Sequence, residues 1–359
     1  MPKRKFPYII IGGGSAAFAA AFKAGKLGVK TLMVNDGLLG GTCVNVGCFP
    51  SKHLLRAAEV LYYGTHHNFP GIKLKVEDFS FEKVIGEEKR LVEKLRREKY
   101  KNVLEAMAEV ELIEERAKFV SSNEIEVNGE KFEGEKFLIA TGSSPFIPPI
   151  EGIERIDYWT NVGALKPPKL PESLIVLGAG PLGLEFAQMY HHFGSRVTVV
   201  EYAPKILSRM EPEVGESIAK YLRDEGIEIL TSAKATKVEK ERGFLKLTVQ
   251  QDGKSLNLVA EKLLVAAGRR PNTRDLGLEK VGVAVDEKGA VITNEEMRTN
   301  APHVWAAGDV VSRVVMLETT AAKEGSIATE NAWKNAGRKM GWGAVPQTIF
   351  TSPQISTVG

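Results

Sequence analysis

Only two cysteines occur in the 359-residue chain, Cys43 and Cys48, and both lie in the stretch GGTCVNVGCFPSK at residues 40–52. Two thiols five positions apart can close a small disulfide ring where the backbone permits, and Gly47 supplies backbone freedom. Such a pair can take part in thiol–disulfide exchange, which requires a thiolate. The pair also fits two other interpretations, a buried apolar pair or half of a zinc site. A zinc site needs further Cys or His ligands, and the six histidines are not grouped at ligand spacing.

The composition is that of an ordinary folded protein. Apolar residues make up 43% and charged residues 26%, and the net charge is only +3 with the basic residues scattered. This distribution gives no indication of binding to nucleic acid or to an anionic membrane. No apolar run is long enough to span a membrane, and three glycines interrupt the N-terminal stretch that resembles a signal peptide. We therefore expect a cytoplasmic protein, in which disulfides are usually transient and catalytic.

Two stretches of the chain repeat one pattern. In the first, an apolar run ends at Gly12, a helix of small residues follows, and a second apolar run ends at Asn35. In the second, the corresponding positions are Gly178 and Glu201, and in both copies 23 positions separate the glycine from the polar residue. The spacing predicts two strand–helix–strand units in matching register. The two stretches are residues 8–35 and 174–201.

Each copy carries a glycine-rich turn of the kind that binds dinucleotides. The first reads G-x-G-x-x-A from Gly12 and the second G-x-G-x-x-G from Gly178, and each follows a predicted strand and opens a predicted helix. Glycine lets the backbone approach a pyrophosphate, whose charge is stabilised at the positive end of the helix. The polar residue after the second strand lies where a ribose would bind. We interpret the repeats as two dinucleotide-binding units; the alternative is a pair of incidental strand-to-helix turns.

Other segments predict strands and hairpins around these units. FLIATGSSP, LLVAAGRRPN and HVWAAGDV are each typical of an apolar strand that ends in a turn of small residues. The dipeptides NG at 128–129 and DG at 252–253 predict antiparallel hairpins. Residues 82–107 predict a charged amphipathic helix, and residues 166–171 a linker into the second unit.

The order of these motifs resembles that of the pyridine nucleotide–disulphide oxidoreductase family. The first glycine-rich turn, GGTCVNVGCFPSK, ATGSSP, the second glycine-rich turn, AAGRRPN and AAGDV follow one another as in that family. The resemblance implies an α/β fold with two Rossmann-like dinucleotide-binding domains and antiparallel β-meander insertions. It also implies FAD in the first unit and a nicotinamide cofactor in the second. The implied ranges are residues 1–148 and 270–345 for a discontinuous FAD domain, 149–269 for the NAD(P) domain, and 346–359 for the start of a dimerisation domain.

Within the family, the chain looks most like mercuric reductases. MLETTAAKEGSIATENA and VPQTIFTSPQISTVG are similar to that branch, and the first of these segments lacks the His-Lys pair usual in dihydrolipoamide dehydrogenases. The resemblance implies a FAD-dependent oxidoreductase that reduces Hg(II), with a dihydrolipoamide dehydrogenase-like disulfide reductase as the alternative. A third hypothesis is a non-catalytic flavoprotein that keeps FAD only as structure. The cysteine pair together with Lys52 and Glu185 argues against it, because a structural flavin needs none of them.

The family pattern also implies roles for individual residues. Cys48 would face the flavin as a thiolate, and Cys43 would exchange with the substrate; with Hg(II) as substrate, both sulfurs would contact the metal only transiently. Lys52 and Glu185 match residues that pair near the reactive end of the flavin, and an unpaired acid in the apolar LGLEFAQMY helix would be costly. Asp309 matches the acid that holds the ribityl chain. The alternatives are a solvated helix residue for Lys52 and a turn aspartate for Asp309.

Cofactor contacts follow from the same resemblance. An acid usually holds the adenosine ribose at the end of the first unit, where this chain has Asn35 and then Asp36. Glu201 ends the second unit and can accept hydrogen bonds from the ribose 2′-hydroxyl of NADH, so we expect NADH to be preferred, with NADPH possible. The implied cofactor-binding residues are Gly12, Gly14, Ser15, Ala16, Asn35, Asp36, Gly40, Gly41, Thr42, Cys43, Lys52, Ala117, Ala140, Thr141, Gly142, Ser143, Gly178, Gly180, Pro181, Leu182, Gly183, Glu185, Glu201, Gly268, Arg269, Gly308, Asp309, Met316, Leu317, Glu318 and Thr319.

The C-terminal segment is expected to begin a further domain. By the family pattern Gly359 lies just inside the dimerisation domain, so VPQTIFTSPQISTVG is expected to hold an opening strand with nothing downstream to pair with it. We expect a homodimer for the full-length protein and a weakened or lost dimer for this chain. The expected substrate is a small molecule or a metal ion.

Overall fold

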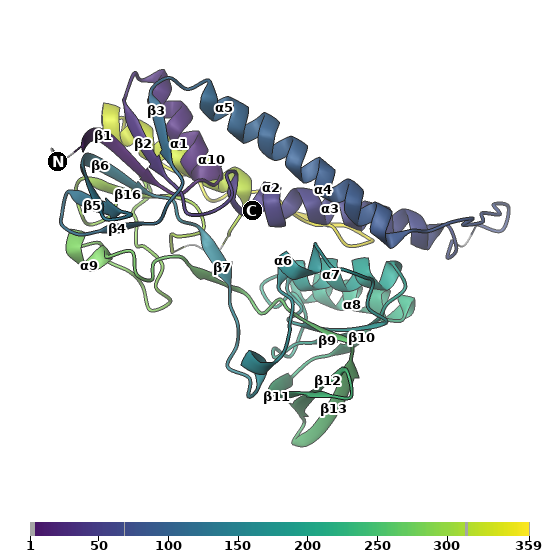
Figure 1. Cartoon of the computed structure of the whole chain (residues 1–359). Coiled ribbons are helices and arrows are strands. Elements are labelled where there is room, and N and C mark those ends of the chain that lie inside the picture. Colours follow the sequence, from purple (N-terminus) through teal and green to yellow (C-terminus); the bar gives the residue numbers. More distant parts are fainter. Residues whose placement is uncertain (1–3, 68, 313–314, 359) are drawn as a thin grey trace.

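The computed structural model describes residues 4–67, 69–312 and 315–358. Residues 1–3 and 359, at the outer ends of the predicted domain ranges, lie outside the described residues. Two units, each with a sheet whose central strands are parallel and flanked by helices, lie next to one another in Figure 1. This arrangement confirms the predicted α/β fold with two Rossmann-like units.

The first unit is built on a seven-stranded sheet. Its strands, in order across the sheet, are β3 (Val110–Ile113), β2 (Thr31–Val34), β1 (Arg4–Ile11), β6 (Glu130–Ile139), β5 (Glu124–Val127) and β4 (Ala117–Phe119), with β16 (Val304–Ala306) parallel to β6. Within β1, Ile9 pairs with Leu32 on one side and Phe137 on the other, both in parallel register. An unbroken apolar run is what such a doubly covered strand requires. Helices α1 (Ser15–Lys26) and α10 (Glu318–Lys334) pack against each other over this sheet (Figure 1).

Antiparallel hairpins extend both units, as the sequence predicts. Between β5 and β6, Asn128 and Gly129 have φ values of 49° and 81°, the left-handed pair that suits a two-residue turn. Asp252 and Gly253 adopt the same conformation, with φ values of 49° and 72°, between two strands of the second unit. That second meander consists of β11 (Ala233–Glu241), β12 (Phe244–Gln251) and β13 (Lys254–Ala260).

The second unit repeats the parallel arrangement on a smaller scale. Its sheet has the order β10-β9-β8-β14, with every neighbour parallel. The strands are β8 (Ser173–Leu177), β9 (Arg196–Val200), β10 (Glu228–Leu230) and β14 (Lys262–Val265), and the helices are α7 (Pro181–His192) and α8 (Pro212–Glu225). α7 is buried along most of its length, in keeping with its apolar sequence.

The chain crosses between the units twice, and the two crossings pair with each other. β7 (Ser143–Pro145) leads into the second unit, and β15 (Arg269–Pro271) returns antiparallel to it. These strands lie beside the predicted domain boundaries at 148/149 and 269/270, which remain a prediction. Shorter elements near the crossings are η2 (Ile153–Arg155), α6 (Asn161–Ala164) and α9 (Leu278–Val281).

Long helices join the two units along one side of the molecule. α3 (Cys48–Tyr63) and α4 (Phe81–Arg96) lie side by side above the second unit in Figure 1. Leu54 of α3 and Ile85 of α4 belong to the same apolar core as Phe186 of α7. The predicted helix at 82–107 is therefore present, although a π turn, η1 (Arg97–Lys101), separates α4 from α5 (Asn102–Glu105). α2 (Gly41–Val46) precedes α3 directly.

The C-terminal segment corrects one expectation. β17 (Gln347–Ile349) does not lack a partner, because the chain turns at residues 350–354 and returns as β18 (Ile355–Thr357). Ile349 and Ile355 lie opposite each other in this antiparallel pair. The hairpin packs against the second unit through α7.

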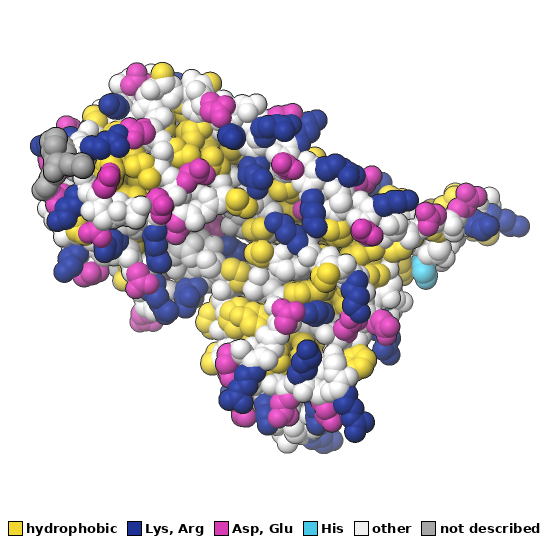
Figure 2. All heavy atoms as spheres, in the orientation of Figure 1, with side chains coloured by type: hydrophobic (Ala, Val, Ile, Leu, Met, Phe, Trp, Pro, Cys, Tyr) yellow, Lys and Arg dark blue, Asp and Glu magenta, His cyan; other side chains and the backbone are white. Residues whose placement is uncertain are grey.

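The surface carries charges of both signs. Figure 2 shows Lys and Arg side chains interspersed with Asp and Glu over the visible face, with hydrophobic side chains gathered between the two units. Among the described residues, no helix combines the length and the apolar character needed to cross a membrane.

Candidate functional site

The first glycine-rich turn brings the backbone of three segments together. The N–H of Gly12 donates to Val34 O at 2.7 Å, which ties the end of β1 to the end of β2. Gly12 has φ +129°, and a Cβ at this position would lie 2.2 Å from Ala140 O. Both the left-handed backbone and the close approach therefore require glycine.

The second turn has the same construction. The N–H of Gly178 donates to Val200 O at 2.8 Å, its φ is +108°, and a Cβ would lie 2.5 Å from Ala266 O. A Cβ at Gly183 would approach Gly178 O to 2.0 Å, so this glycine allows α7 to begin close to β8. The repeat in the sequence is thus a repeat in structure.

Each turn leads into a helix whose first N–H groups are uncapped. Gly14 is the N-cap of α1 and Gly180 that of α7, and neither helix has a side-chain cap hydrogen bond. The N-terminal N–H groups of a helix lack partners within the helix and favour anions. α1 therefore presents the donor set that a pyrophosphate needs, and α7 presents it without a donor at Pro181, which has no N–H.

A cavity of about 720 Å³ follows the first turn and extends to the cysteine pair. It is lined from both units, since Leu182 and Glu185 of α7 face it together with Gly14 and Cys48. All predicted cofactor positions line this cavity except Gly178, Gly180, Gly183, Glu201, Gly268 and Thr319.

Several lining residues are absent from the sequence prediction. Among them are Gly13, Ser51, Arg116 and Asn272. Asn272 connects the two chain crossings, because its Nδ2 donates to Thr141 O at 2.9 Å and its Oδ1 accepts from Ser144 Oγ at 2.7 Å. The motif AAGRRPN contains Asn272, GGTCVNVGCFPSK contains Ser51, and the first turn contains Gly13; Arg116 lies in none of the motifs.

The two thiols lie in contact and differ in acidity. Both are free, and their side chains are hydrogen-bonded to each other. This hydrogen bond lowers the pKa of Cys48, and the nearby Lys52 ammonium lowers it further against an opposing effect of burial. The same hydrogen bond, followed by burial, raises the pKa of Cys43. Cys48 is therefore the thiol that is more readily ionised, next to a cation.

The turn between the cysteines is held by buried polar contacts. Nδ2 of Asn45 donates to Leu39 O at 2.9 Å and to Gly41 O at 2.8 Å, which fixes α2. Gly47 separates α2 from α3 with φ −135°, so a left-handed backbone is not the reason for glycine here. A Cβ at Gly47 would instead lie 2.8 Å from Thr42 O, and glycine is needed for this close approach.

Lys52 and Glu185 meet at the inner wall of the cavity, as the resemblance implied. Lys52 Nζ lies 2.7 Å from Glu185 Oε2, and the Glu185 side chain is only 6% exposed. The other carboxylate oxygen accepts the N–H of Phe350 at 2.8 Å, and Lys52 Nζ lies 4.8 Å from the centroid of the Phe350 ring. Both oxygens of this buried acid are therefore satisfied.

Asp309 is held by a second polar network at the crossings. Ser143 Oγ donates to Asp309 Oδ2 at 2.8 Å, and Arg269 Nε donates to Ser143 Oγ at 2.7 Å. Arg269 Nη2 also donates to Ser143 O at 2.6 Å. Burial lowers the pKa of Arg269, and Asp309 opposes this effect.

The polar residues that end β2 and β9 face their glycine-rich turns. Asn35 is buried against Gly13, where a Cβ would lie 2.5 Å from the Asn35 side chain. Glu201 accepts the N–H of Ala179 at 2.6 Å and that of Ala203 at 2.7 Å. Both side chains therefore contact their glycine-rich turns, and their predicted contact with a ribose remains a prediction.

These features fit a dinucleotide with a redox group. The cavity joins a glycine cradle, an uncapped helix N-terminus and an acid at Asp309 to the thiol pair. Within residues 4–67, 69–312 and 315–358, no group of three or more His, Cys, Asp or Glu side chains is arranged so that it could hold a metal ion.

Comparison with known proteins identifies relatives over almost the whole chain. A mercuric reductase of Bacillus cereus is 38% identical over 99% of this chain and 56% of its own length. A mercuric reductase of Streptomyces lividans is 40% identical over 98% of this chain and 74% of its own length. A dihydrolipoyl dehydrogenase of Thermus scotoductus is 39% identical over 99% and 76%. The chain spans 56% to 64% of the length of the Bacillus cereus, Lysinibacillus sphaericus and Staphylococcus aureus mercuric reductases that it matches.

A solved structure and a family model agree with these relatives. The Cu(II) complex of the HOCl-induced flavoprotein disulfide reductase RclA from Escherichia coli aligns with TM-score 0.86 at 29% identity, over 98% of this chain and 77% of that chain. The family model described as pyridine nucleotide-disulphide oxidoreductase matches residues 6–325. The chain therefore belongs to the pyridine nucleotide-disulphide oxidoreductase family.

Proposed function

We propose that the chain binds FAD in the cavity between the first glycine-rich turn and the cysteine pair. The N-terminus of α1 would hold the pyrophosphate, Asn35 and Asp36 the adenosine ribose, and Asp309 the ribityl chain. When bound, FAD would accept a hydride from a nicotinamide cofactor and release electrons in the direction of the thiols. The observation that supports this proposal best is the common cavity, which includes Gly14, Asp309 and both cysteines.

We propose that the second turn binds NADH in preference to NADPH. The Glu201 carboxylate is held at the glycine-rich turn by two N–H groups and can accept from a ribose hydroxyl. A 2′-phosphate at this position would meet a like charge. Lys205 is paired with Glu216 at 2.8 Å, and Arg196 lies at the start of β9 rather than its end, so neither compensates for a second negative group.

The thiols would carry the reducing equivalents to the substrate. Oxidation of the Cys43 and Cys48 thiols to a disulfide releases two electrons and two protons, which balances the reduction of Hg(II) to Hg(0). The lower pKa of Cys48 favours a thiolate that faces the flavin, and Cys43 remains available for the substrate. Relatives named mercuric reductase support Hg(II) as the electron acceptor.

A disulfide is the alternative substrate. Cys43 would then attack one sulfur of the substrate, Cys48 would resolve the mixed disulfide, and two substrate thiols would leave. The relative named dihydrolipoyl dehydrogenase and the structure of a flavoprotein disulfide reductase favour this reading. We also propose that the full-length protein is a homodimer. This chain spans only part of the mercuric reductases that it resembles.

The experiment that separates the two substrates is an anaerobic assay of NADH oxidation by the purified, FAD-loaded chain. Hg(II) buffered with excess low-molecular-weight thiol is compared with lipoamide and glutathione disulfide. We expect turnover with Hg(II), and loss of that turnover in Cys43→Ala. Turnover with a disulfide but not with Hg(II) would establish the alternative. Absence of flavin reduction by both NADH and NADPH would reject both.

A further inference from the structure

A row of polar side chains occupies one face of the buried helix α7. Glu185, Gln188 and His192 lie at intervals of three and four positions, so they share a face of the helix. Each is almost fully buried, with 5%, 1% and 6% exposure. Buried polar groups of this kind need partners, and the partners determine what the face does.

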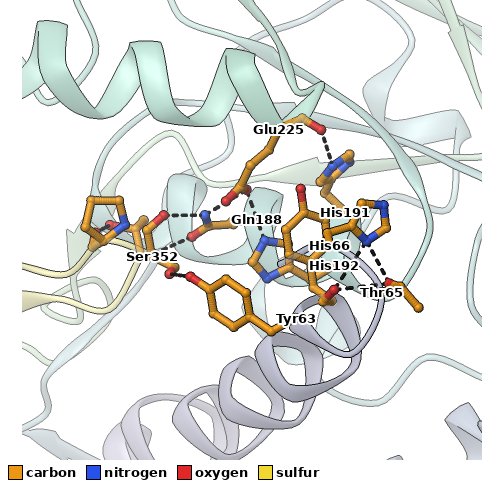
Figure 3. Close-up of polar contacts among 11 residues, drawn as sticks. Tyr63, Thr65, His66, Gln188, His191, His192, Glu225 and Ser352 are labelled. Atoms are coloured by element: carbon orange, nitrogen blue, oxygen red, sulfur yellow. Dashed lines mark hydrogen bonds and ion pairs between the residues drawn. The ribbon is translucent and has the colours of Figure 1, made fainter. Parts of the chain in front are cut away.

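Gln188 uses all its hydrogen-bonding groups except one lone pair, and two of its three bonds go to one residue. Its Nε2 donates to Ser352 O at 2.8 Å and to Glu225 Oε2 at 2.9 Å, and its Oε1 accepts the N–H of Ser352 at 2.7 Å. The amide orientation follows from these partners, because the reverse orientation would turn Oε1 toward a carbonyl and a carboxylate. Figure 3 shows Gln188 between Ser352 and Glu225.

Glu225 is held from its other side by histidines. Its Oε2 lies 3.0 Å from His192 Nε2, and its main-chain oxygen lies 2.8 Å from His191 Nε2. The His192 ring stacks on Tyr62, with centroids 4.0 Å apart and planes at 11°. The acceptor that fixes the Gln188 amide is therefore itself anchored, at the end of α8 (Figure 3).

The segment 350–352 reaches from Gln188 to the redox end of the cavity. Two residues before Ser352, the N–H of Phe350 donates to Glu185 Oε1 at 2.8 Å, and Glu185 Oε2 binds Lys52 Nζ at 2.7 Å. Ser352 Oγ also lies 2.6 Å from the hydroxyl of Tyr63, the last residue of α3. The segment is thus attached to α7 through Glu185 and Gln188, and to α3 through Tyr63 and the cation–ring contact of Lys52.

We propose that Gln188 is a positioning residue: by binding the main chain of Ser352 it holds the N–H of Phe350 against Glu185, and so keeps Lys52 at the cavity wall. A glutamine suits this task because its amide has two donors for Glu225 Oε2 and Ser352 O, and an acceptor for the N–H of Ser352. A glutamate of the same shape would set a second carboxylate against Glu225 and Ser352 O. The contribution of Lys52 to the reaction rests on the function proposed above, whereas the contact itself does not.

The test uses two variants of Gln188 and one matched control. Gln188→Met removes all three hydrogen bonds with little change of length, and Gln188→Glu replaces the two donated bonds by repulsion between oxygens. Ser352→Ala is the control, since it loses the Tyr63 contact but keeps the main-chain groups that Gln188 binds. Two quantities are measured on the purified chain without NADH or Hg(II). They are amide hydrogen exchange at residues 350–352, and acetylation of Lys52 by acetic anhydride relative to the exposed Lys254.

We expect both Gln188 variants to speed exchange at Phe350 about tenfold, the effect of losing roughly one hydrogen bond. Acetylation of Lys52 relative to Lys254 should rise about threefold as its ion pair loosens, and Ser352→Ala should change neither quantity. Faster exchange with unchanged Lys52 acetylation would overturn the proposal, as would no change in either. If the Gln188 variants do not fold, Phe350→Pro removes both the donor to Glu185 and the ring that contacts Lys52, and unchanged Lys52 acetylation in that variant would also overturn the proposal. Because neither readout uses the cofactor reaction, a failed Hg(II) assay leaves this result intact.

Discussion

Lys52 Nζ lies 2.7 Å from Glu185 Oε2, and this ion pair joins α3 of the first unit to α7 of the second across 133 residues of sequence. The Glu185 side chain is buried, whereas the Lys52 side chain is 32% exposed. The pair therefore connects the helix that starts at Cys48 to the helix that starts at the second glycine-rich turn.

Removal of the cation should leave a buried carboxylate with one partner instead of two. We expect Lys52→Met to lower the free energy of unfolding by about 1–2 kcal/mol, below the cost for a fully buried pair because Lys52 is partly solvated. Urea denaturation monitored by circular dichroism measures the change. Lys73→Met, at an exposed position, serves as the control and should have no effect. Equal stability of Lys52→Met and the unmodified chain would show that solvent replaces the pair without cost.

Replacing the first glycine of either turn with alanine should weaken binding of one cofactor and leave the other bound. Gly12→Ala puts a Cβ 2.2 Å from Ala140 O, and we expect FAD affinity to fall at least about tenfold. Gly178→Ala puts a Cβ 2.5 Å from Ala266 O, and should weaken nicotinamide binding while FAD stays bound. Flavin fluorescence and NADH titration measure the two affinities. Gly25→Ala, where a Cβ meets nothing within 4 Å, is the matched control. Loss of FAD from both turn variants equally would contradict separate sites.

The choice of nicotinamide cofactor should depend on Glu201. We expect flavin reduction by NADH to be at least about tenfold faster than by NADPH at equal concentration, because a 2′-phosphate would face the carboxylate. Glu201→Gln removes the charge and should narrow this ratio, mainly through faster reduction by NADPH. Stopped-flow measurement of flavin bleaching with both donors gives the ratio. A tenfold advantage for NADPH in the unmodified chain would rule out this assignment.

Glu88 should make stability dependent on pH. This α4 residue is fully buried, neither carboxylate oxygen has a hydrogen-bond partner among the residues that the structure describes, and burial raises its pKa from 4.5 to about 7. Because the folded state binds the proton more tightly, stability is greatest below the unfolded pKa. It should fall by roughly 2–3 kcal/mol as the pH rises from 4.5 to about 7.

The variant Glu88→Gln should remove most of this pH dependence, because an amide does not ionise. Glu87→Gln, at the exposed neighbouring position, should retain it. Urea denaturation at pH 5, 6, 7 and 8 supplies the comparison. If the three proteins lose stability in parallel over this range, the Glu88 carboxyl is not the group responsible.

Local patterns in the sequence were enough to predict the repeated units. Glycine at Gly12 and Gly178 is required by backbone contacts at the strand ends, and the left-handed pairs at 128–129 and 252–253 are required by their turns. Such constraints act on neighbouring residues, so they leave a readable spacing. The Lys52–Glu185 pair was anticipated only through resemblance, because nothing near either residue shows that the two would meet.

The features that the sequence does not predict depend mostly on contacts between distant segments of the chain. Gln188 and Ser352 are 164 positions apart, and neither their types nor their neighbours signal the contact. The apolar pattern at the C-terminus predicts one strand, whereas the structure has a hairpin of two short strands, β17 and β18. Glu88 lies on the same helix face as the buried residues Ile85 and Val92. Helical periodicity therefore indicates that Glu88 is buried, although the segment as a whole is highly charged.

The proposed electron exchange between the two cysteines, Cys43 and Cys48, and a flavin bound in the shared cavity can be measured directly. The FAD-loaded, disulfide-oxidised chain is titrated anaerobically with NADH and denatured, and its free thiols are counted with Ellman's reagent. We expect the first equivalent of NADH to expose both cysteine thiols of the chain, and the corresponding titration of Cys43→Ala to expose none beyond the single thiol already free. Bleaching of the flavin by NADH with no new thiols would show that the cysteines do not receive electrons from the flavin.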